Sequence, residues 1–104
     1  MYLPGQYQYQ MGYTEAEFDR ALHAGFTSAA TSWRCHARAR RQWLITDETS
    51  DLQMQINIQP LAPRQLGLLQ LPVLQVSFVC LQGDADSEQR FFSSFFKYFH
   101  KGGG

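Results

Sequence analysis

Residues 53–59, Gln-Met-Gln-Ile-Asn-Ile-Gln, alternate strictly between amide-bearing and apolar side chains. Successive side chains of a β-strand point to opposite faces of the sheet, so this stretch predicts a strand with one buried face and one face in water. The same period of two returns in residues 73–81, whose apolar phase consists of Leu74, Val76, Phe78 and Cys80. Both segments therefore indicate a sheet that is covered on one side only.

Two further segments share this period. In residues 33–45 one phase holds Trp33, Cys35, Ala37, Ala39, Trp43 and Ile45. In residues 6–13 the larger apolar side chains are Tyr7, Tyr9, Met11 and Tyr13, and glutamines fill the other phase. We therefore predict four strands, at 6–13, 33–45, 53–59 and 73–81, with the polar residues 47–51 as the hairpin loop between the second and third.

Two segments carry the helical period instead. Thr14 and Glu17 have the spacing of a capping box, and the apolar residues that follow at helical spacing are Phe18, Ala21, Leu22, Gly25, Phe26 and Ala29. A second helix is predicted to begin in the acidic stretch 84–88, which suits the positive end of the helix dipole. Its apolar arc of about 160° is formed by Phe91, Phe92, Phe95, Phe96, Tyr98 and Phe99. Lys97, His100 and Lys101 fall in its last turns, where the dipole favours positive charge.

Residues 60–72 combine three prolines with five leucines. The prolines exclude a fully paired central strand, whereas the leucines favour burial. We interpret this stretch as a partly extended edge segment. The alternative is a fifth strand that is continuous with 73–81 through a bulge at Pro72.

The predicted order is β-α-β-β-β-α within one domain, residues 1–104, because 104 residues suffice for a single hydrophobic core. Since each strand has one polar phase, the sheet is expected to be mostly antiparallel with both helices on one face. The fold class is thus α+β, a two-layer sandwich with a four-stranded or five-stranded sheet. The terminal Gly102-Gly103-Gly104 is expected to be a disordered tail.

The formal charges sum to zero, which argues against a strongly basic nucleic-acid-binding protein. All nine acidic residues lie at the starts of the two predicted helices or in the loop 47–51. By contrast, Arg34, His36, Arg38 and Arg40 share the polar phase of the second predicted strand. The open sheet face is therefore expected to carry a basic stripe that overall neutrality conceals.

Three interpretations of this stripe remain open. It is either the solvated face of a strand, an anion-binding surface assisted by Gln53, Gln55 and Gln75, or a surface for self-association. The anionic partner would be an acidic protein or a nucleic acid. Stacking of bases on the sheet would require outward aromatic rings, and the tyrosines of residues 6–13 are predicted to point into the core instead.

The residues offer little for catalysis. His23, His36 and His100 are far apart and have no metal-ligand spacing, so no metal site and no cofactor are expected. Cys35 and His36 are adjacent in a strand and therefore point to opposite faces, which prevents a thiolate–imidazole pair. We expect a protein that is not an enzyme.

The phenylalanines of the second helix suggest an alternative function. Their arc is wide enough to line a hydrophobic-ligand pocket as well as the core, or to form a dimer interface. The pocket residues would be Phe91, Phe92, Phe95, Phe96 and Phe99.

The start of the chain does not resemble a signal peptide, and no apolar run is long enough to span a membrane. The sequence therefore predicts a cytoplasmic, non-catalytic binding module, a small-ligand carrier, or a structural or dimerising subunit.

Overall fold

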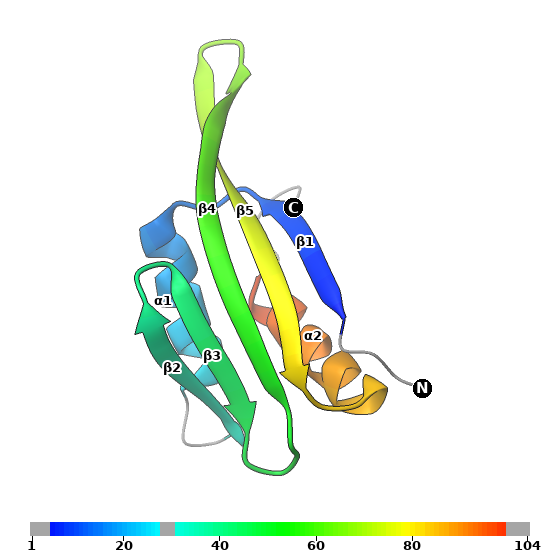
Figure 1. Ribbon diagram of the computed structural model, residues 1–104. Helices are drawn as coiled ribbons and strands as arrows, with labels where there is room; N and C mark the ends of the chain where they lie inside the picture. The colour runs from blue at the N-terminus through cyan, green and yellow to red at the C-terminus, as the bar shows by residue number, and fades with distance from the viewer. Residues whose placement is uncertain (1–4, 28–30, 100–104) are drawn as a thin grey trace.

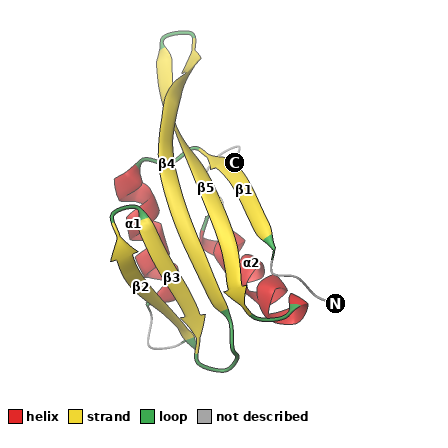
Figure 2. Cartoon of the chain, viewed as in Figure 1, coloured by secondary structure: helices red, strands yellow, loops and turns green. Residues whose placement is uncertain are grey.

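The computed structural model describes residues 5–27 and 31–99. Along the chain its elements are β1 (Gln6–Met11), α1 (Glu15–Phe26), β2 (Trp33–Ala39), β3 (Gln42–Asp47), β4 (Gln53–Leu66), β5 (Leu69–Gln82) and α2 (Ala85–Tyr98) (Figure 1). The strands form one antiparallel sheet in the order β1-β5-β4-β3-β2. Both helices lie on the same face of this sheet (Figure 2). The predicted two-layer α+β sandwich is confirmed, with five strands.

The pairing of β4 with β5 shows how the alternation produces the core. Ile56 lies opposite Phe78 and Ile58 lies opposite Val76, and all four side chains are buried beneath the helices. The intervening glutamines and Asn57 point to the other face. On the other side of β5, Tyr7 lies opposite Phe78, so the tyrosines of β1 face the helix layer, as predicted. Tyr7 and Tyr9 do not enter the core as expected, because β1 is an edge strand and both side chains remain more than a third exposed.

The prediction of a single strand over 33–45 is wrong. The chain reverses at Arg40 and Arg41, and Arg41 has a φ of 63°, in the left-handed region where glycine or asparagine is usual. The register also shifts between Ala37 and Ala39, which places one extra residue in β2. Because of that bulge Ala39 lies opposite Gln42 on the open face, and not in the core phase as expected.

Residues 60–72 also differ from the prediction of an edge segment. They form the outer parts of β4 and β5, which project beyond the rest of the sheet as a two-stranded arm (Figure 1). A turn at Gly67 and Leu68 closes the arm, and Gly67 supplies the positive φ of 59°. The register irregularity lies in β4, between Leu61 and Arg64, on the strand opposite Pro72.

The arm tolerates three prolines because neither of its strands has a second neighbour. β3 pairs with β4 only as far as Asn57, and β1 pairs with β5 only as far as Leu74. A proline whose nitrogen faces outward from such a ribbon removes no ladder hydrogen bond. The leucines of the arm remain on the surface: Leu68 is fully exposed, and Leu66 and Leu69 are each more than half exposed.

The core between the layers is a cluster of aromatic rings. Phe18 and Phe26 of α1 and Phe91 and Phe95 of α2 are completely buried. The two helices approach closely at Gly25, where a Cβ atom would lie 2.7 Å from the ring of Tyr98. The predicted capping box of Thr14 and Glu17 is formed, and a second one, which was not predicted, joins Asp84 and Ser87. The predictions for Ala29, for His100 and Lys101, and for the tail 102–104 lie outside the described residues.

Candidate functional site

The open face of the sheet is dominated by side-chain amides. Gln53, Gln55 and Gln75 all lie on it, as predicted from the alternation, and the pairing registers place six further amides around them: Gln6, Gln8, Gln10, Gln42, Asn57 and Gln59. Two hydrogen bonds connect neighbouring strands across the face, from Gln75 to Gln8 at 3.0 Å and from Gln42 to Asn57 at 2.8 Å. The remaining amides are available to hydrogen-bond a partner that lies along the strands.

Arg34 lies on this face but is held by other groups. Its Nε lies 2.6 Å from a carboxylate oxygen of Glu48, and its Nη1 donates to the main-chain oxygens of Thr31 and Trp33. His36, two residues along β2, lies 3.1 Å from the hydroxyl of Thr46 on the neighbouring strand. Because Arg34 is paired with Glu48, the part of the predicted stripe formed by Arg34 and His36 contributes less positive charge than the sequence suggests.

The other predicted arginines gather at the β2–β3 hairpin. Arg38 lies in the bulge and Arg40 in the turn, so neither belongs to a regular strand face. Both are exposed, and within residues 5–27 and 31–99 neither has a carboxylate partner. Arg41 does have one, Glu15 of α1, at 2.6 Å. The free positive charge of the site is thus concentrated in Arg38 and Arg40, at one margin of the amide-rich face.

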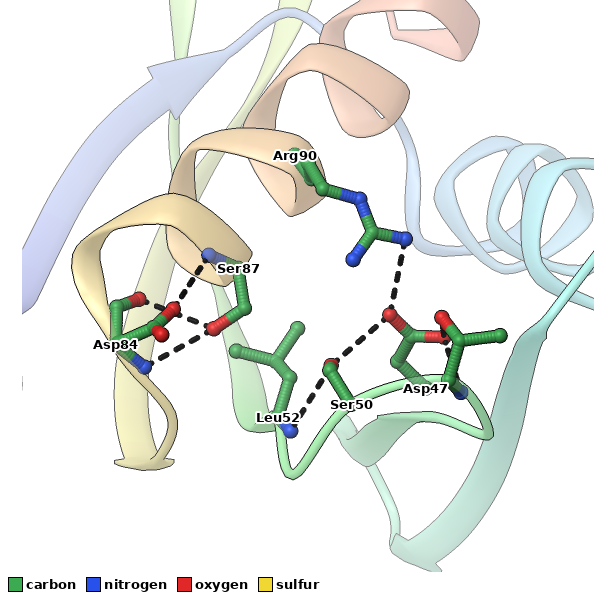
Figure 3. Close-up of polar contacts among 7 residues, drawn as sticks. Asp47, Ser50, Leu52, Asp84, Ser87 and Arg90 are labelled. Atoms are coloured by element: carbon green, nitrogen blue, oxygen red, sulfur yellow. Dashed lines mark hydrogen bonds and ion pairs between the residues drawn. The ribbon is translucent and has the colours of Figure 1, made fainter.

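Asp47 is the centre of a second polar cluster, which the sequence did not reveal (Figure 3). It is only 4% exposed and ends β3 beneath α2. Its carboxylate accepts hydrogen bonds from the backbone and hydroxyl of Thr49, at 3.0 and 2.9 Å, and from the hydroxyl of Ser50 at 3.0 Å. Arg90 of α2 completes the cluster at 3.1 Å.

Hydrogen bonding, not burial, decides the charge state of Asp47. Burial by itself would raise the pKa of this carboxyl, but the bonds from Ser32, Thr49 and Ser50 outweigh it and lower the pKa to about 2. The guanidinium of Arg90 also lies over the ring of Trp33, 5.6 Å from its centre. The cluster therefore links the β3–β4 loop to α2 through hydrogen bonds and an ion pair. Its polar groups bind one another.

Neither thiol has the environment of a reactive nucleophile. Burial, assisted by Asp19, raises the pKa of Cys35 to about 11, and burial also raises that of Cys80. The thiolate forms are therefore disfavoured at neutral pH. In the described part of the chain no three His, Cys, Asp or Glu side chains are grouped so that they would hold a metal ion. His100 lies outside that part.

The five phenylalanines proposed as a ligand pocket separate into two groups. Phe91, Phe95 and Phe99 are buried against other rings, and Phe95 and Phe99 stack with their centroids 4.1 Å apart. Phe92 and Phe96 lie at the margin of α2 that faces β1. There Phe92 lines a cavity of about 310 Å³, with Tyr7, Tyr9, Ala85, Glu88 and Gln89 as its other lining residues.

Comparisons with known proteins assign no relatives: no protein-family model matches the chain, and no curated protein matches it either. Within residues 5–27 and 31–99, neither helix has the length and apolar character needed to cross a membrane.

Proposed function

We propose that this chain is a non-catalytic interaction module that binds an acidic protein segment along the open face of its sheet. The observation that supports the proposal is the position of Arg38 and Arg40, two exposed cations without a carboxylate partner among the described residues, beside an uncovered face rich in amides. Arginine forms bidentate hydrogen bonds with carboxylates, and the amides add donors and acceptors for main-chain groups.

An acidic protein segment suits this face better than a nucleic acid does. Single-stranded nucleic acids are usually bound on sheets by stacking of bases on aromatic rings. The tyrosines of β1 face the helix layer, and the described part of the open face carries no Phe, Tyr or Trp.

Two free thiols, Cys35 and Cys80, fit a reducing compartment, so we propose that the module acts in the cytoplasm.

Reversal of the two free charges tests the proposal. The double variant Arg38→Glu with Arg40→Glu is expected to bind a fluorescent ten-residue glutamate peptide at least tenfold more weakly, because each attraction becomes a repulsion. Fluorescence anisotropy at low ionic strength measures this. Arg20→Glu with Lys97→Glu changes two exposed residues of the helix layer and alters the net charge by the same amount, so it is the matched control and should change the affinity less than twofold. Equal weakening by the control would show that net charge alone acts, and would contradict the proposal.

The apolar arm favours a second candidate, a structural subunit that associates with itself. Its exposed leucines and its two unpaired strand edges are features that promote association between chains. If this candidate is correct, the chain sediments as an oligomer at micromolar concentration, and Leu68→Ser with Leu69→Ser converts it to a monomer. Leu81→Ser, which changes an exposed leucine elsewhere on β5, should leave the oligomer intact. A wild-type chain that is monomeric throughout would rule this candidate out.

A further inference from the structure

The cavity between β1 and the first half of α2 lies on the helix side of the sheet, away from the amide-rich face. Its volume of about 310 Å³ is at the lower end of the range for small-molecule sites. Tyr7 and Tyr9 border it on the strand side, and Phe92 borders it on the helix side. Half of the six residues that line the cavity are therefore aromatic.

One acidic side chain in this wall has no partner. Glu88 lines the cavity and is only 4% exposed, and both of its carboxylate oxygens are buried without a hydrogen bond from any described residue. Burial raises the pKa of this carboxyl. An unpaired buried carboxyl lowers stability, and such groups are rare in folded proteins. Its neighbour Asp84 differs, because its carboxylate caps α2 through the backbone N–H of Ser87.

The cavity brings three aromatic rings close to this carboxyl. The ring of Phe92 meets that of Tyr7 edge to face, with the centroids 5.0 Å apart, and lies 6.4 Å from that of Tyr9. Both tyrosines remain more than a third exposed, so their rings are accessible from solvent. Aromatic faces attract ammonium groups, and this attraction adds to that of a carboxylate in the same site. A metal ion would gain nothing from rings and would find a single carboxylate.

We propose that this cavity is a binding site for a small alkylammonium ion, whose charge pairs with Glu88 and whose alkyl groups contact Tyr7, Tyr9 and Phe92. The Glu88 side chain has several staggered rotamers, so pairing requires a change of rotamer and no movement of the backbone. The site is separate from the open sheet face, and neither proposal depends on the other.

Titration of the whole chain with tetramethylammonium and with butylammonium, followed by NMR of the tyrosine and Phe92 ring signals, tests the proposal. The expected dissociation constant is about 1 mM or lower for at least one of the two ions. tert-Butanol, a neutral molecule of similar shape to tetramethylammonium, should bind at least tenfold more weakly. Equal binding of tert-butanol, or no shift of these signals with 10 mM of either ion, about ten times that dissociation constant, would overturn the proposal.

Variants identify the groups responsible. Glu88→Gln keeps the shape of the side chain without its charge, and it should weaken alkylammonium binding at least tenfold. Asp86→Asn removes an exposed acid two residues away on the same helix and should change binding less than twofold. Phe92→Leu keeps apolar volume without the ring and should weaken binding about fivefold or more. If Glu88→Gln does not fold, this variant tests the proposal in its place. Unchanged affinity in Glu88→Gln or in Phe92→Leu would contradict the proposed site.

Discussion

Replacement of Phe95 by alanine is expected to lower the free energy of unfolding by about 3–5 kcal/mol, a large share of the stability of a domain of this size. Phe95 is completely buried in the last turn of α2. Its ring contacts Phe78 of the sheet, with the centroids 4.9 Å apart, and Phe18 of α1 at 6.3 Å. Truncation therefore removes apolar contacts with the sheet and with α1, and it leaves a cavity that the surrounding rings cannot fill.

Phe96 provides the matched control for this prediction. It is the next residue on the same helix and has the same chemical structure, but it is 39% exposed. Phe96→Ala is expected to cost clearly less than Phe95→Ala, about 1 kcal/mol, because part of its surface is already in water. Urea unfolding followed by circular dichroism measures both values. Equal losses for the two variants would show that the packing of α2 on the sheet differs from that described.

Substitution of Asp47 by asparagine is expected to lower the free energy of unfolding by about 2 kcal/mol at pH 7. The side chain of Asp47 is fully buried next to Arg90, and its hydrogen bonds lower its pKa from 3.8 to about 2. An asparagine is uncharged, so the charge-assisted bonds from Arg90 and the hydroxyls of the loop are weakened. Asp51→Asn, in the same loop but exposed, should change stability by no more than about 0.5 kcal/mol.

The pH dependence of the Asp47 effect has a definite sign. Because folding lowers the pKa of this carboxyl, its contribution is complete above the pKa of the unfolded chain, near 4, and is lost as the pH falls through about 2. The stability difference between the wild type and Asp47→Asn should therefore be largest at neutral pH and shrink between pH 4 and pH 2. A difference that stays constant over this range would mean that Asp47 is not held as a carboxylate.

The alternation of residues 53–59 and 73–81 was sufficient to predict the sheet, its covered face and the direction of the glutamines. The capping box of Thr14 and Glu17 likewise located the first helix, and the acidic stretch 84–88 with the aromatic spacing located the second. The turn at Arg40 and Arg41 could not be predicted in the same way, because the sequence contains no glycine or asparagine there. The bulge next to it also keeps Ala37 and Trp43 on one face, so the apolar phase continues through the reversal as it would in one strand.

The candidate sites were less accessible to sequence reasoning because they depend on pairs of distant segments. Asp47 is one of several acids in a polar loop, and only the packing of α2 above it brings Arg90 into contact. Glu88 belongs to an acidic stretch that is typical of a helix start. In the structure, however, its side chain lies on the side of α2 that faces β1 and is buried. A signal was available in its spacing: Glu88 precedes Phe91, Phe92 and Phe95 at helical intervals and so continues the apolar arc.

The most direct test of the proposed function is to map the contact surface of an acidic peptide on the protein. Side-chain amide signals in NMR report this surface, since Gln53, Gln55 and Gln75 lie on the open face and Gln89 lies on α2, in the other layer. On titration with a ten-residue glutamate peptide, we predict shifts in the signals of the three sheet glutamines and of the backbone at Arg38 and Arg40, with Gln89 unchanged. Shifts confined to Gln89 and the two helices would contradict the account.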